Sequence, residues 1–177
     1  MRVKSLLFPL LLAVLLLAPQ TLAQDNQGAD ERMGAQIAGA WLGEGEFSVD
    51  IGCDGTFDLG PFPFTDSQAF GAEGLHTAVN PANPNTGNGT WMRTGRRQVR
   101  ARDINFGVDA TPNGTLTSVA IISVIFDFDP GFRTATSTFA ARVFGPTDDP
   151  LEDEPFACSL GQHTLLRKVD AKWVMVP

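Results

Sequence analysis

The sequence contains no tyrosine, two histidines and two cysteines in 177 residues. Without tyrosine, the chain lacks one of the side chains that enzymes use as a general acid or base. His76 and His163 lie far apart in the sequence, and neither has a second His or Cys at the spacing of a metal site, so we expect no metal. The Gly-x-Ser-x-Gly motif of hydrolases is also absent. No motif therefore names a reaction, and we expect no cofactor.

Basic residues are few. The chain has 13 Lys and Arg against 20 Asp and Glu, a net charge of −7. Two of the basic residues, Arg2 and Lys4, precede the only long apolar run, and without them the net charge becomes −9. An acidic chain without a basic stripe is a poor partner for nucleic acid or for anionic lipid.

The long apolar run at the start of the sequence is typical of a signal peptide. It extends from Leu6 to Ala18 behind the two basic residues, and small residues end it at Ala23. The alternative is a membrane anchor, but the run is short for a bilayer. We therefore expect residues 1–23 to be removed, the rest to be secreted or periplasmic, and no membrane span to remain.

The remaining 154 residues fit one domain. Residues 24–36 are polar and weakly patterned, so we expect a flexible leader there, followed by a single domain over residues 37–177. Long runs rich in β-branched and aromatic residues are separated by Pro-Asn-Gly and Asp-Pro-Gly turns. Counting them gives seven or eight strands, which predicts an all-β fold, an antiparallel up-and-down barrel.

The segment between the first strand, expected over residues 40–50, and the clear strands is harder to interpret. Pro61 and Pro63 are incompatible with a central strand, so residues 53–64 are expected to be irregular. Residues 65–79 are a plausible strand region, and residues 80–88 are so rich in Asn, Pro and Gly that we expect a loop.

Two motifs point to a family of barrels. Gly39-Ala40-Trp41 resembles the Gly-x-Trp of lipocalin-like, or calycin, barrels, and residues 89–145 resemble a group of uncharacterised secreted bacterial proteins with a barrel similar to that of allene oxide cyclases. In calycins the Trp closes the bottom of the barrel and a basic residue from the last strand packs over it. The resemblance thus implies structural roles for Trp41 and Arg167.

Two features concern covalent and subunit contacts. In an exported chain, Cys53 and Cys158 are expected to form a disulfide, the alternative being two buried thiols. Residues Val119–Phe126 are apolar on both faces, so the outer face of this strand is expected to be covered. The cover is either a second copy of the chain, giving a homo-oligomer, or the N-terminal leader or C-terminal tail.

Polar groups inside the barrel would be the best candidates for chemistry. The alternation of Arg100, Arg102 and their neighbours suggests that Asp103 and Asn105 point inward. A buried Asp could serve as an acid or base. The alternative is a structural ion pair between Asp103 and an Arg on the next strand, such as Arg142.

The lack of catalytic motifs favours a barrel that binds a small apolar molecule in its lumen. The residues expected to line the pocket or core are Phe47, Val49, Trp91, Phe106, Phe126 and Phe139. One alternative is an isomerase or cyclase that uses Asp103 and Asn105 in the same pocket. Another is a filled barrel that acts as a structural or interaction module.

Overall fold

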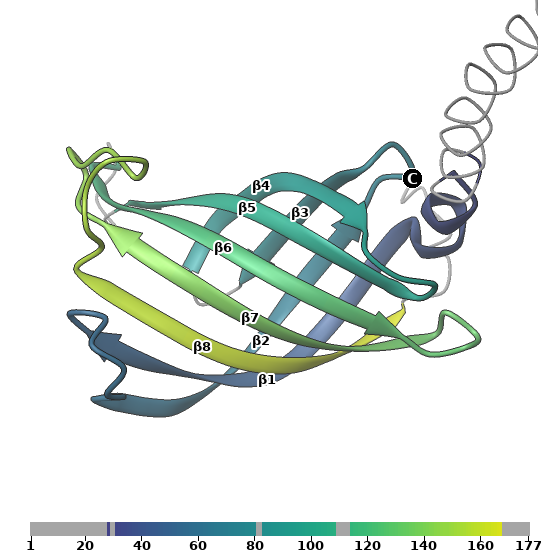
Figure 1. Cartoon of the computed structure of the whole chain (residues 1–177), viewed down its shortest axis with the longest axis horizontal. Helices are drawn as coiled ribbons and strands as arrows, with labels where there is room; N and C mark the ends of the chain where they lie inside the picture. Colours follow the sequence, from purple (N-terminus) through teal and green to yellow (C-terminus); the bar gives the residue numbers. More distant parts are fainter. Residues whose placement is uncertain (1–27, 29–30, 81–82, 109–113, 168–177) are drawn as a thin grey trace, which may run out of the picture.

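Eight antiparallel strands form one closed barrel in the computed structural model, which describes residues 28, 31–80, 83–108 and 114–167. Each strand pairs with its neighbours in the sequence, and the last strand pairs with the first (Figure 1). The predicted up-and-down barrel is confirmed. The strands are β1 (Gly39–Ile51), β2 (Leu59–Phe70), β3 (Leu75–Asn80), β4 (Asn83–Arg93), β5 (Gln98–Val108), β6 (Leu116–Phe128), β7 (Thr134–Phe144) and β8 (Ala157–Arg167).

One end of the barrel is closed by a hydrophobic core. Trp41, at the start of β1, is fully buried and packs edge-on against Phe128, with ring centroids 5.3 Å apart. A short helix over residues 31–37 covers this end, and its Met33 and Ile37 belong to the same core (Figure 1). The Trp41 indole N–H donates to the Ile37 carbonyl at 2.9 Å. Within the expected leader, the described residues from 31 onward are therefore helical and packed.

Arg167, at the end of the last strand, stabilises this closed end. The Arg167 guanidinium carbon lies 5.7 Å from the Trp41 ring centroid, so the expected contact is present. The same guanidinium donates to the carbonyls of Gln36 and Ala38 at 2.7 and 2.9 Å. A cation over an indole face contributes about 0.5–2 kcal/mol. Arg167 thus joins the helix, β1 and β8 at one point.

The expectation of an irregular segment over residues 53–64 is wrong in its second half, because β2 begins at Leu59. Pro63 pairs with Glu46 of β1, and β3 pairs with β2 only from Ser67 onward. The first half of β2 therefore has a free edge, and a proline at an edge removes no ladder hydrogen bond.

The expected loop over residues 80–88 is also mostly strand. β4 begins at Asn83, and Thr86 to Asn88 pair with Thr77 to Val79 of β3. Inward-facing Gly87 and Gly89 leave room for side chains of neighbouring strands. Gly87, the one glycine of the expected loop, instead creates space inside the barrel together with Gly89.

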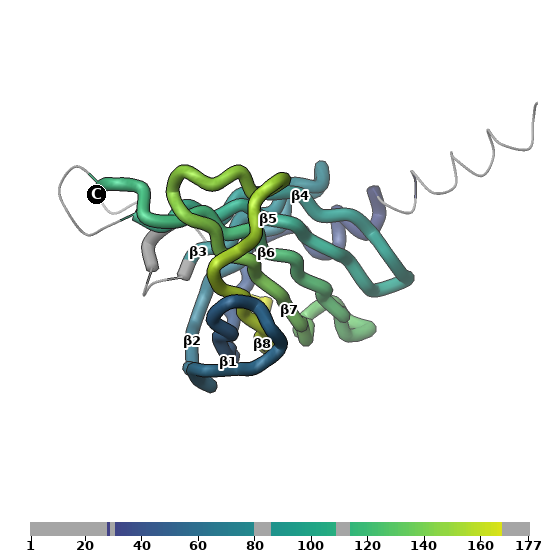
Figure 2. Tube along the Cα trace, turned by 60° about the vertical axis from the view of Figure 1, so that its left-hand side comes forward, coloured from purple at the N-terminus to yellow at the C-terminus, as the bar shows by residue number. Residues whose placement is uncertain are grey.

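The opposite end of the barrel, the mouth, carries the disulfide. Cys53 follows β1 and bonds to Cys158 at the start of β8, so the predicted pairing is confirmed. Figure 2 shows β1, β2 and β8 side by side, and β1 pairs with β8 from Trp41 to Ile51. The bridge therefore fastens the loop after β1 to the strand that closes the barrel.

Candidate functional site

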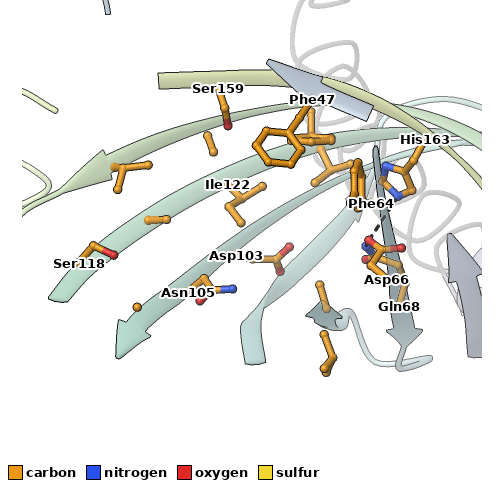
Figure 3. A pocket seen from close by; sticks show the side chains of 18 residues that line it. Phe47, Phe64, Asp66, Gln68, Asp103, Asn105, Ser118, Ile122, Ser159 and His163 are labelled. Carbon is orange, nitrogen blue, oxygen red and sulfur yellow. Dashed lines mark hydrogen bonds and ion pairs between the residues drawn. The ribbon is translucent and has the colours of Figure 1, made fainter. Parts of the chain in front are cut away.

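The mouth half of the barrel contains a cavity of about 330 Å³ (Figure 3). Its size is typical of a site for one small molecule. Small inward-facing residues on three strands, Ala78, Gly107 and Ala120, leave the space that larger side chains fill at the closed end. The most apolar part of the wall consists of Phe47, Phe64, Ile122, Val124, Phe139 and Val143.

Three phenylalanines form one side of this wall. The Phe64 ring lies 5.9 Å from that of Phe47 and 5.7 Å from that of Phe139, both edge-on. The Phe64 ring also lies 5.6 Å from the His163 imidazole. The aromatic wall therefore continues directly into a buried polar layer.

The polar layer crosses the barrel between the cavity and the closed end. Its first part is a pair: the Asp103 carboxylate oxygens lie 2.8 and 2.9 Å from His76 Nδ1, and both side chains are buried. Gly89 lies between them in the sheet, paired with His76 on one side and with Asp103 on the other. A Cβ at Gly89 would collide with Asp103 Oδ1, so the pair depends on this glycine.

The second part of the layer links four side chains from β2, β7 and β8. Ser137 Oγ lies 2.7 Å from His163 Nδ1, and His163 Nε2 lies 3.8 Å from Asp66 Oδ2. The Gln68 amide donates to the same Asp66 oxygen. Figure 3 shows Asp66 and Gln68 next to His163, with Asp103 directed toward the same side of the cavity.

Burial shifts the protonation of this second part. Desolvation raises the pKa of the Asp66 carboxyl, an effect that the nearby His163 and the Gln68 hydrogen bond partly oppose. Desolvation lowers the pKa of His163, and the Asp66 charge partly opposes that shift. Both shifts favour the neutral forms, as expected for ionisable groups held away from water.

Three buried atoms of the layer have no hydrogen-bond partner among the described residues: Asp66 Oδ1, Gln68 Oε1 and His76 Nε2. Leaving a buried polar atom unpaired costs about 1–3 kcal/mol. Such atoms are rare in folded proteins and therefore call for an explanation.

The structure brings together only some of the expected site residues. Asp103, Asn105, Phe47 and Phe139 line the cavity. Trp91 and Phe126 are buried in the closed-end core, and Val49 does not contribute to the cavity wall.

The expectation that Phe106 lines the pocket or core is wrong, because its side chain is 52% exposed on the outer face of the barrel. It shares the parity of Ile104, whereas Asp103 and Asn105 take the inward positions. The suggested partner of Asp103 is also wrong. Arg142 is exposed and lies over the Phe144 ring at 5.3 Å, and Asp103 pairs with His76 instead.

Asp66, Gln68 and Ser137 were not among the expected site residues, and neither histidine was expected at a site. One signal was available: Asp66 and Gln68 share the parity of Phe64 and Phe70, so a strand there places all four on one face. The expected strand region over residues 65–79 already held Asp66 and Gln68, and the prolines hid only the first half of β2, which includes Phe64. The pairing of His76 with Asp103 needed the register of β3, β4 and β5.

In the part of the chain that the structure describes, no three His, Cys, Asp or Glu side chains gather where they could hold a metal ion. No helix in the described ranges is long and apolar enough to cross a membrane. Comparisons of the chain with protein-family profiles, with curated proteins and with solved structures give no match.

Proposed function

We propose that this chain is an exported barrel protein that binds a small, largely apolar molecule in the mouth cavity. The observation that carries the proposal is the cavity itself: aromatic and aliphatic side chains form most of its wall, and a few buried polar groups lie at its inner end. Sites for small organic molecules have this composition, since apolar contact supplies affinity and a few polar groups fix orientation. A filled structural barrel has less support, because side chains fill only the closed end.

The test is titration with Nile red, a neutral dye whose fluorescence reports an apolar environment. Ala120→Phe places a large side chain inside the cavity, and we expect it to abolish binding. Ala140→Phe is the matched control, because Ala140 is exposed on the outer face of β7. Equal binding by both variants, or no binding by the unmodified protein, would contradict the proposal. If binding is found, native mass spectrometry of protein purified from its own host would identify the natural ligand.

Export is part of this proposal. Residues 1–23, the expected signal peptide, lie outside the described residues. Support comes from their sequence pattern and from the Cys53–Cys158 disulfide, which is compatible with an oxidising compartment. The intact mass of protein purified from its own host tests this directly, because it should equal the mass of a chain that begins at Gln24.

A second candidate is proton-transfer chemistry of the isomerase or cyclase type in the same cavity. The observation that favours it is that Asp103 both lines the cavity and bonds to buried His76. A carboxylate held by an imidazole beside an apolar substrate pocket suits a general base. Asp103→Asn is expected to abolish turnover without unfolding the barrel. Loss of folding would make Asp103 a structural residue.

Self-association remains an expectation for the outer face of the Val119–Phe126 strand. Ile121 on this face is half-buried, and its partner on β5, Ile104, is 45% exposed, next to the exposed Phe106. A second copy of the chain would remove this apolar surface from water. Light scattering after size-exclusion chromatography should show an oligomer that Ile121→Lys dissociates. A monomer at all concentrations would contradict the expectation.

A further inference from the structure

The cavity wall is acidic. Asp66 and Asp103 contribute carboxyl groups to it, and no Lys or Arg is among the described residues that line it. The arginines of β5, Arg100 and Arg102, are exposed and point away from the lumen. The described wall of the cavity therefore offers a negatively charged ligand no Lys or Arg partner.

The polar layer also contains buried acceptors that lack donors. Asp66 is 8% exposed and Gln68 is 4% exposed, and Asp66 Oδ1 and Gln68 Oε1 have no partner among the described residues. The Gln68 amide bonds to the other Asp66 oxygen, which holds the two side chains together. Two adjacent buried acceptors define the complementary group as one that carries several hydrogen-bond donors.

The histidine next to Asp66 makes no hydrogen bond to it. His163 Nε2 is 3.8 Å from Asp66 Oδ2, and burial raises the pKa of Asp66 and lowers the pKa of the imidazole, so the ionised carboxylate has no close cation in the described part of the chain to stabilise it. Asp103 has its own partner in His76. Asp66 is thus the carboxyl group that gains most from a positive charge in the cavity.

The aromatic wall of the cavity adjoins this polar layer. Phe64 contacts both His163 and the other two phenylalanines of the wall, Phe47 and Phe139. Aromatic faces attract cations and also accept apolar groups. A ligand with a cationic head and an apolar body would match both parts of the cavity.

We infer that the ligand of the mouth cavity is a small organic amine. It binds as an ammonium ion, with its nitrogen against Asp66 and Gln68 and its apolar part against Phe47, Phe64 and Phe139. An ammonium group has several donors and no acceptor, whereas a hydroxyl has one donor and a carboxylate has none. This inference rests on the proposed function, because it assigns a ligand class to the same cavity.

The test compares three ligands of similar shape: phenethylamine, phenethyl alcohol and hydrocinnamate. Isothermal titration calorimetry at neutral pH should show that the amine binds at least about tenfold more tightly than the alcohol, as expected for charge-assisted hydrogen bonds in a buried site. Hydrocinnamate should bind most weakly. Equal affinity for the amine and the alcohol would overturn the inference.

A matched pair of variants assigns the preference to one carboxyl group. Asp66→Asn should reduce the ratio of amine to alcohol affinity to about one, because the neutral amide cannot offset the ammonium charge. Glu44→Gln removes the same charge from the exposed outer face of β1, and it should leave the ratio unchanged. An unchanged ratio in Asp66→Asn would overturn the assignment to this site. If that variant does not fold, the preference of the unmodified protein still decides the ligand class.

Nile red separates this inference from the proposed function. If the dye and phenethyl alcohol bind but the amine gains nothing, the cavity binds apolar molecules and only the ligand class is wrong. If neither the dye nor any of the three ligands binds, the proposed function itself fails. Displacement of the dye by phenethylamine, but not by hydrocinnamate, is the result that supports both.

Discussion

The two halves of the barrel interior are built from the same strands but differ in what they enclose. β2 supplies Phe70 to the closed-end core, and four residues earlier it supplies Asp66 to the polar layer. β8 likewise supplies Leu165 to the core and His163 to the polar layer. The closed end maximises apolar burial, whereas the mouth half keeps buried polar atoms and empty volume. Stability gained in one half offsets the cost of the cavity and the unpaired polar atoms in the other.

The largest effect is expected from opening the closed end. Trp41→Ala removes the contacts with Phe70, Phe128 and the helix over residues 31–37. We expect a loss of about 3–5 kcal/mol in the free energy of unfolding, measured by denaturant titration. Leu42→Ala is the control, since Leu42 is exposed on the outer face. Similar losses in the two variants would contradict the assigned role of the closed end.

The mouth is expected to depend on its disulfide rather than on packing. Replacement of Cys53 and Cys158 by Ser releases a loop with a sequence separation of 105. The expected loss is about 2–4 kcal/mol, most of it through the greater freedom of the unfolded chain. Chemical denaturation with and without reductant measures it, and the double variant should not respond to reductant. An unchanged stability would mean that local packing alone holds the mouth.

A glycine, Gly89, makes room for the His76–Asp103 pair of the polar layer. A Cβ at Gly89 would meet Asp103 Oδ1 and the Arg102 carbonyl, so Gly89→Ala should cost about 1–3 kcal/mol through overpacking. At Gly87, two residues away on the same face, a Cβ would meet its nearest atom at 3.6 Å, an ordinary contact. Gly87→Ala is therefore the matched control. Equal thermal stability of the two variants would show that the His76–Asp103 pair does not need the space.

The smallest effect is expected in the pH dependence of stability. Burial raises the pKa of Asp66 above its ordinary value of 3.8, so the folded state holds this proton where the unfolded state has released it. Stability from this group is present below that value and is lost as the pH rises through the raised pKa.

The contribution of His163 to stability changes with pH in the opposite direction. Burial lowers its pKa below 6.5, so its contribution rises with pH up to that value. Asp66→Asn removes the Asp66 contribution and also the charge that opposes the lowering of the His163 pKa, and both changes have the same sign. The stability of the variant relative to the unmodified protein should therefore increase as the pH rises from about 4. Denaturant titrations across this range measure it, with Glu44→Gln as the control. A difference that is constant with pH would contradict the assigned shift.

The closed end was predictable from the sequence, and much of the site was not. The role of Trp41 there followed from the resemblance of Gly39-Ala40-Trp41 to the motif of calycin barrels. At the mouth, the disulfide was predictable because Cys53 and Cys158 are the only cysteines. Asp66 and Gln68 lie in the region over residues 65–79 where a strand was expected, but Pro61 and Pro63 hid the first half of β2, which pairs only with β1. Local residue preferences do not reveal which strands lack a neighbour.

Contacts between strands that are not neighbours in the sheet are a second limit on what the sequence predicts. Alternation places Asp103 on the inner face, but its partner depends on the register of two further strands. His76 and Asp103 meet only because each pairs with Gly89. Phe106 is a different case, because regular alternation from Asp103 through Asn105 already places it on the outer face, and β5 pairs with β6 without a register shift up to Gly107.

The pairing of β1 with β8 also sets the order of events when the chain is made. β1 is the first strand to be synthesised and β8 the last, yet they pair along their whole length. Until Arg167 has been added, one edge of β1 has no partner, and the clamp on Trp41 cannot form. An open sheet edge invites pairing with other chains, and contacts between distant residues form slowly. The barrel therefore closes only after β8 has been synthesised, and the sheet has an open edge until then.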